Sequence, residues 1–157
     1  MELVDELFTL SRAFERAQIA YAVCGGLAVT IHGRPRLTVD IDIMIPKPVM
    51  ERAIELAAGV GFDMHEGWVP LPKNDLGIDR LFRLTKIEGE EFLTLDLLEA
   101  DSGTNRLFAS RERVSLGDHE ITVLSRDAII AMKSRSDRTK DRLDIEMLQD
   151  DTDKNGG

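Results

Sequence analysis

The chain has 157 residues, 43% of them hydrophobic and 31% charged, a composition that is typical of a folded globular domain and excludes fibrous, repetitive and wholly disordered proteins. Its 20 Lys and Arg residues against 29 Asp and Glu residues give a net charge of −9, which excludes the binding of nucleic acid by overall charge. The single cysteine, Cys24, excludes an internal disulfide and fits a reducing cytoplasm.

The first predicted element is an amphipathic helix over residues 2–17. Its apolar side chains recur at three- and four-residue steps: Leu3, Leu7, Leu10, Phe14 and Ala17. The acidic start lacks the basic region of a secretory signal. The longest apolar stretch, residues 19–29, is broken by glycines and is shorter than the roughly 18 residues that a membrane span needs. We therefore expect a cytoplasmic protein with no membrane partner.

A strand over residues 19–24 is predicted next, followed by a turn at Gly25 and Gly26 and a short helix that ends near Gly33 and Pro35. A glycine turn at the start of a helix lets backbone N–H groups approach a phosphate closely. An ordinary strand-to-helix turn would use the same glycines. The turn alone therefore does not predict a phosphate site.

Residues 39–45 alternate β-branched apolar residues with Asp40 and Asp42. Because side chains alternate along a strand, both carboxylates point to one face, with Cα atoms roughly 6.6 Å apart at about 3.3 Å per residue. Aspartate is depleted in strands, and adjacent like charges repel unless something positive joins them. The pattern favours one or two divalent cations between the carboxylates. The alternative is a half-buried strand with an acidic outer face.

The middle of the chain contains a third strand carboxylate, Asp96. A helix over residues 49–58, a strand over 62–68 and a loop over 69–79 lead to a hairpin with strands 80–87 and 92–98. In the second of these strands Leu93, Leu95 and Leu97 share one face, and Asp96 lies on the other. Three carboxylates on neighbouring strands would form a cation site that none of them could form alone.

The last third of the chain predicts a second hairpin over residues 113–124 and a helix capped by Ser125. A basic segment over residues 133–142 follows, which we interpret mostly as a salt-bridged helix surface. The sequence thus predicts one domain over residues 1–149 and a frayed acidic tail over 150–157. The expected fold is α/β (α+β), a small mixed sheet with the aspartate strands central and helices mainly on one face.

Across residues 15–148 the chain resembles the nucleotidyltransferase superfamily, which includes DNA polymerase β. The shared features are a glycine pair after a strand, an acidic-x-acidic pair on the next strand and a later acidic residue. The segments GGLAVTIHGRPRLTVDIDIMI and DAIIAMKSRSDRTKDRLDIEML are most similar to small toxin transferases of the AbiEii type. The combination is specific, whereas each part occurs in unrelated proteins.

The resemblance implies metal and catalytic roles for the three aspartates. Asp40 and Asp42 would bind the ion that holds the nucleoside triphosphate. Asp40, Asp42 and Asp96 together would bind the ion that activates the acceptor hydroxyl. Asp96 would also be the candidate base. The implied cofactor is Mg²⁺, as two ions, with Mn²⁺ as a substitute.

The resemblance also implies a phosphate site. Gly25 and Gly26 would hold the β- and γ-phosphates through backbone N–H groups, and Arg36 and Lys133 are candidates for further phosphate contacts. Gly26 stands where many relatives have serine, so a hydroxyl contact to phosphate is absent here.

The implied function is transfer of a nucleoside monophosphate from an NTP to a hydroxyl on RNA such as a tRNA end, on a protein, or on a small molecule such as an antibiotic. Expected partners are the NTP, a nucleic-acid end gathered by basic residues (Arg34, Arg36, Arg135 and Arg138), and an antitoxin or a second copy of the chain. A non-catalytic nucleotide-binding or regulatory module of a toxin–antitoxin pair is the alternative. A metal-dependent hydrolase is disfavoured because His32, His65 and His119 are dispersed.

Overall fold

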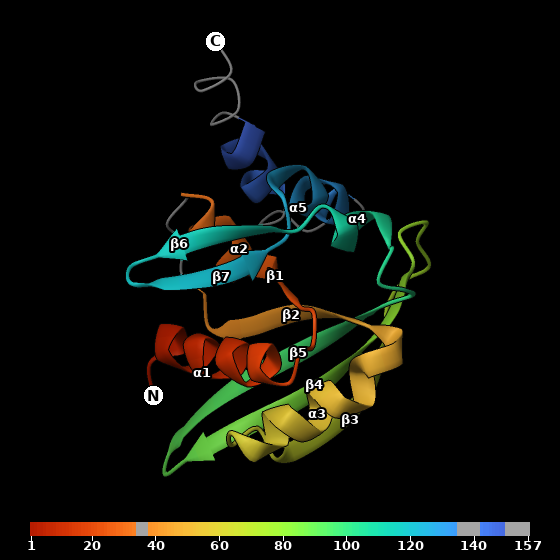
Figure 1. Cartoon of the computed structure of the whole chain (residues 1–157). Helices are drawn as coiled ribbons and strands as arrows, with labels where there is room; N and C mark the ends of the chain where they lie inside the picture. The colour runs from red at the N-terminus through yellow and green to blue at the C-terminus, as the bar shows by residue number, and fades with distance from the viewer. Residues whose placement is uncertain (34–37, 135–141, 150–157) are drawn as a thin grey trace.

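The computed structural model describes residues 1–33, 38–134 and 142–149. Its strands are β1 (Ala22–Cys24), β2 (Asp40–Pro46), β3 (Met64–Pro70), β4 (Ile78–Glu88), β5 (Glu91–Ala100), β6 (Glu112–Leu116) and β7 (His119–Val123). In the described part of the chain these seven strands form one sheet in the order β3-β4-β5-β2-β1-β7-β6 (Figure 1). The pairs β2–β5 and β1–β7 are parallel, and the other pairs are antiparallel. The prediction of a small mixed sheet with the aspartate strands central is confirmed.

The helices are α1 (Leu3–Arg16), α2 (Gly25–Ile31), α3 (Met50–Gly59), α4 (Arg106–Ala109) and α5 (Arg126–Lys133). A 3₁₀ turn over Lys47–Val49 leads into α3, and residues 142–149 are also helical. The helices α1 and α3 lie side by side along one face of the sheet, and α2 and α5 pack together near β1 (Figure 1). No helix in the described ranges is long and apolar enough to cross a membrane.

The face of the sheet under α1 and α3 is the closed, apolar one. The predicted alternation along β2 is observed, because Ile41, Ile43 and Ile45 are fully buried there. An ion pair also fastens α1 to this face, since Lys86 of β4 lies 2.9 Å from the Glu6 carboxylate. The carboxylates of β2 therefore have to point to the opposite face.

Two local structures differ from the sequence prediction. The first strand begins only at Ala22, because the Ile19 N–H donates to the Phe14 carbonyl at 2.9 Å and so belongs to the end of α1. The short helix α4 was not predicted. It begins because the Asn105 side chain accepts hydrogen bonds from the N–H groups of Leu107 and Phe108, as a helix cap does. The predicted acidic tail over 150–157 lies outside the described residues.

The predicted cap of the last named helix is confirmed. The Ser125 hydroxyl accepts a hydrogen bond from the Ala128 N–H at 3.1 Å. The helix α5 then runs to Lys133, where the basic segment begins. This places Lys133 close to the helical residues 142–149, which matters for the site.

Candidate active site

The three predicted carboxylates come from two neighbouring parallel strands. Asp42 of β2 lies directly opposite Asp96 of β5, and Asp40 lies opposite Thr94. Partners across a sheet point to the same face, so the structure brings Asp42 and Asp96 together with Asp40 one pleat away. Asp40 is exposed, Asp42 is half-buried and Asp96 is 8% exposed. The row therefore runs from solvent into the sheet, as a site that admits a ligand from one side requires.

The glycine turn lies against this row. Cys24, the last residue of β1, is the register partner of Asp42. Gly25 then adopts φ +66°, and a Cβ at this position would lie 2.8 Å from Cγ of Asp42 and overlap its Oδ2. A side chain at position 25 is thus disfavoured twice, by the left-handed backbone and by the carboxylate. Glycine lets the start of α2 approach Asp42 closely.

Arg83 completes the row, and the sequence analysis did not predict it. It is the β4 register partner of Asp96, and its Nε and Nη2 donate to the two oxygens of that carboxylate at 2.8 and 3.0 Å. These hydrogen bonds, followed by the nearby carboxylate charges, raise the pKa of the Arg83 guanidinium. A bidentate arginine gives the carboxylate a fixed orientation.

Lys133 is buried at the edge of the site and is paired. Its Nζ lies 3.0 Å from Oδ2 of Asp144, and the two side chains are only 10% and 3% exposed. The pKa of the Cys24 thiol responds to the charges around it. Burial raises this pKa well above the ordinary value, and the charges of Asp42 and Asp96 raise it further, whereas the charge of Lys133 lowers it. Lys133 therefore acts electrostatically on the same corner of the sheet as the aspartates.

Asp144 is a second residue that sequence reasoning missed. It is a carboxylate with a side chain 3% exposed, whereas the sequence analysis interpreted the preceding segment 133–142 mostly as a salt-bridged helix surface. The predicted phosphate ligand Arg36 and the other basic residues proposed for a nucleic-acid end, Arg34, Arg135 and Arg138, lie outside the described residues.

The carboxylates suit a hard divalent cation in their chemistry, since Mg²⁺ prefers carboxylate oxygens. Within residues 1–33, 38–134 and 142–149, however, no group of three or more His, Cys, Asp and Glu side chains is arranged as metal ligands. Asp96 is not free to act as a metal ligand in this arrangement, because both of its carboxylate oxygens accept hydrogen bonds from Arg83. The three carboxylates therefore fit a divalent cation in their chemistry, but the third of them, Asp96, is hydrogen-bonded to Arg83.

The three histidines contact groups other than the aspartates. The ring of His32 lies 2.8 Å from the Leu124 carbonyl oxygen, His65 lies edge-on to Phe82, and His119 stacks on Phe8 with 3.9 Å between ring centroids. They belong to different elements, as their spacing in the sequence suggested. They do not supplement the aspartates.

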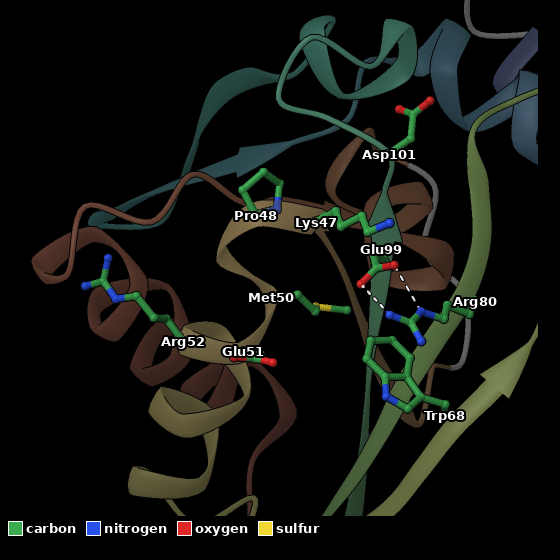
Figure 2. A pocket seen from close by; sticks show the side chains of 9 residues that line it. All are labelled: Lys47, Pro48, Met50, Glu51, Arg52, Trp68, Arg80, Glu99 and Asp101. Carbon is green, nitrogen blue, oxygen red and sulfur yellow. Dashed lines mark hydrogen bonds and ion pairs between the residues drawn. The ribbon is translucent and has the colours of Figure 1, made fainter.

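A cavity of about 550 Å³ opens on the other face of the sheet, beside the start of α3 (Figure 2). Figure 2 shows Arg80 between the Trp68 ring and the Glu99 carboxylate; the guanidinium carbon lies 3.5 Å from the ring centroid, and Nε lies 3.0 Å from Glu99. Glu99 is the register partner of Ile45, not of an aspartate. This cavity is separate from the aspartate row.

No protein-family model matches the chain, and no curated protein matches it. Solved structures share its fold. The lincosamide antibiotic adenylyltransferase LnuA, in its lincomycin-bound crystal structure, superposes with a TM-score of 0.67 at 20% identity, over 92% of this chain and 95% of LnuA. ANT(2'')-Ia, in complex with adenylyl-2''-tobramycin, gives 0.59 at 17% identity over 92% and 86%.

A third solved structure extends the comparison beyond these two proteins. The Thermotoga maritima protein TM1012, a proposed nucleotidyltransferase, gives a TM-score of 0.58 at 14% identity over 96% of both chains. At such identities the likeness establishes the fold. The chain has the nucleotidyltransferase fold, as the sequence resemblance implied.

Proposed function

We propose that this chain is a metal-dependent nucleotidyltransferase that moves a nucleoside monophosphate from an NTP to a hydroxyl group. The observation that supports it most is the pairing of Asp42 with Asp96 on parallel strands, with Gly25 pressed against Asp42. The fold shared with LnuA and ANT(2'')-Ia supports the same reaction class. A carboxylate pair beside a close backbone approach is what a triphosphate with its cation needs.

In the proposed reaction the acceptor oxygen forms a bond to the α-phosphorus of the NTP. The bond between that phosphorus and the bridging oxygen breaks, and diphosphate leaves with the electron pair. The acceptor proton passes to a carboxylate, for which Asp96 is the candidate. Before a cation binds, Arg83 would fix the orientation of that carboxylate through its two hydrogen bonds.

Asp40, Asp42 and Asp96 would hold the cation, Mg²⁺ as two ions or Mn²⁺ in its place. A bound divalent cation would neutralise the phosphate charge and make the acceptor hydroxyl easier to deprotonate. Further phosphate contacts are proposed for Gly25 and Gly26 through their backbone, and for Lys133 and Arg36 through charge. Since Lys133 pairs with Asp144 at 3.0 Å, its effect on phosphate would be exerted at a distance.

Two acceptor classes are proposed. The first is a small molecule such as an antibiotic, and what supports it is a likeness of fold: the superposition covers 95% of LnuA, a transferase with lincomycin bound, and 92% of this chain. An RNA end or a protein acceptor, in a toxin–antitoxin setting, is the second proposal, which rests only on the resemblance of two sequence segments to AbiEii-type toxins. An antitoxin or a second copy of the chain would then be the partner.

Transfer of label from each α-³²P-NTP in Mg²⁺ or Mn²⁺ tests the proposal. The acceptor panel contains lincosamides, aminoglycosides, tRNA and total cell protein, and Asp42→Asn is assayed in parallel. We expect labelled product with one acceptor class and its loss in Asp42→Asn. Phosphate release with water as sole acceptor would instead assign a hydrolase, and product formation that is unchanged in Asp42→Asn would contradict the proposed site.

The alternative, a non-catalytic nucleotide-binding or regulatory module, predicts a different result. Such a module would bind NTP with an affinity that does not depend on Mg²⁺ and would form no product. Calorimetric titration of NTP with and without Mg²⁺ separates the two. The intact set of three aspartates favours the enzyme, because a module without turnover does not need them.

A further inference from the structure

Arg83 holds the third carboxylate of the row by a specific geometry. Its guanidinium donates to Oδ1 and Oδ2 of Asp96 at 2.8 and 3.0 Å, from the register-paired position on the neighbouring strand. The Asp96 side chain is 11% exposed and that of Arg83 is 37% exposed. A cation bound to Asp96 would therefore lie close to the guanidinium charge in a partly buried place, where like charges repel strongly.

A second carboxylate, that of Glu66, also lies near the Arg83 guanidinium. The register of β3 shifts between His65 and Gly67, so that Glu66 occupies a bulge; bulges re-aim side chains next to active sites. Its Oε2 lies 3.9 Å from Nε of Arg83, and its Oε1 accepts from the Thr85 hydroxyl at 3.5 Å. Arg83 is thus within ion-pair reach of Glu66 while it is hydrogen-bonded to Asp96.

We propose that Arg83 is a positioning residue with two partners: it holds Asp96 while no cation is bound there, and it moves to Glu66 when a divalent cation takes Asp96. This inference rests on the proposed function, which assigns Asp96 to the cation. Arg83 then supplies the positive charge beside Asp96 while no cation is bound there. Cation binding then includes the cost of separating Arg83 from Asp96.

The other arginine of β4 provides the matched control. Arg80 makes the same kind of pair with Glu99 of β5, at 3.0 and 3.4 Å. That pair lies on the opposite face of the sheet, and Trp68 stacks on the guanidinium. Substitution of Arg80 therefore removes one cross-strand arginine–carboxylate pair and leaves the aspartate row unchanged.

The experiment measures Mn²⁺ affinity without nucleotide, from the electron paramagnetic resonance signal of free Mn²⁺. Two variants are expected to change it in opposite directions. Arg83→Met removes the competing charge, so Mn²⁺ should bind about 10-fold more tightly, equivalent to about 1.4 kcal/mol. Glu66→Gln removes the second partner of Arg83, so Mn²⁺ should bind several-fold more weakly. Arg80→Met should leave the affinity unchanged.

A purely structural role for Arg83 would weaken Mn²⁺ binding in Arg83→Met, because Asp96 would lose its orientation, and that result would overturn the inference. An unchanged affinity in either Arg83→Met or Glu66→Gln would overturn it too. Should Arg83→Met not fold, Arg83→Lys keeps the charge but loses the bidentate bond, and it should bind Mn²⁺ more tightly than the native protein by a smaller factor.

The outcomes also separate this inference from the proposed function. If the native protein binds Mn²⁺ and Asp42→Asn does not, while Arg83→Met equals the native protein, the cation site stands and the arginine exchange is wrong. If neither the native protein nor Arg83→Met binds Mn²⁺, both the exchange and the proposed cation site are wrong.

Discussion

Two arginine–carboxylate pairs join the same two strands, β4 and β5, on opposite faces of the sheet. Arg83 binds Asp96 and Arg80 binds Glu99, both through two hydrogen bonds. What differs is the next strand. Asp96 lies beside Asp42 of β2, whereas Glu99 lies beside the fully buried Ile45. A cross-strand ion pair alone is thus part of an ordinary sheet, and the neighbouring aspartate turns one of the two into a candidate site.

We propose that the aspartate face is functional and the Arg80 face structural, and substitutions on each face test that division. The largest expected effect follows from Asp42→Asn, which should lower nucleotidyl transfer by about 10²–10⁴-fold because a carboxylate proposed to hold the cation is lost. Initial rates at saturating Mg²⁺ and NTP measure this. The matched change Glu99→Gln should leave the rate within a factor of about two; an equal loss in both variants would remove the distinction between the two faces.

Breaking the buried ion pair at the edge of the site should destabilise the protein most. Either Lys133→Met or Asp144→Asn removes the 3.0 Å ion pair from a charged group that stays buried, which costs about 3–5 kcal/mol of unfolding free energy. Urea denaturation measures the loss. The exposed pair Arg113–Glu120, at 3.1 Å, is the control, since Glu120→Gln should cost about 1 kcal/mol or less. Equal losses at the two pairs would contradict a buried role for Lys133.

The close approach of Gly25 to Asp42 predicts a smaller loss. Gly25→Ala and Gly117→Ala both place a side chain on a left-handed backbone, at φ +66° and +63°, which costs about 1–2 kcal/mol each. Only the first also meets another side chain, since nothing lies within 4 Å of a Cβ at Gly117. Gly25→Ala should therefore be the more destabilising of the two and should alone weaken NTP binding. Equal losses of stability would show that the Asp42 side chain moves away from the new Cβ at little cost.

The smallest effect concerns the buried thiol beside the row. Burial, and then the charge of Asp42, raise the pKa of Cys24 in the folded protein above its value of 9.0 in the absence of such effects. The unfolded chain therefore loses the thiol proton first as the pH rises, so the contribution of Cys24 to stability declines above about pH 9. The difference in unfolding free energy between the native protein and Cys24→Ala should shrink from pH 8 to pH 10. A constant difference would mean that the thiol titrates normally.

Sequence reasoning was most successful where strand alternation governs structure. The alternation in residues 39–45 and 92–98 predicted that Asp40, Asp42 and Asp96 leave the apolar face, and the register of β2 with β5 joins Asp42 to Asp96. The glycine turn was also predicted, although its reason, the contact of Gly25 with Asp42, is a tertiary one. The fold class followed from these strands.

The roles of Arg83 and Asp144 could not be predicted in the same way. Arg80 and Arg83 are three residues apart and so lie on opposite faces; which of them meets the aspartate row depends on the register of the β4–β5 hairpin. Glu66 meets Arg83 only because β3 carries a bulge. Asp144 pairs with a lysine eleven positions away, a distance that no helical spacing rule covers.

Binding of NTP by isothermal titration calorimetry tests the central claim most directly, because it needs no knowledge of the acceptor. The native protein and Glu99→Gln should bind NTP in Mg²⁺ and lose most of that binding when Mg²⁺ is removed, and Asp42→Asn should bind weakly in both conditions. NTP binding that is equally strong without Mg²⁺, and unchanged in Asp42→Asn, would contradict a cation site at the aspartate row.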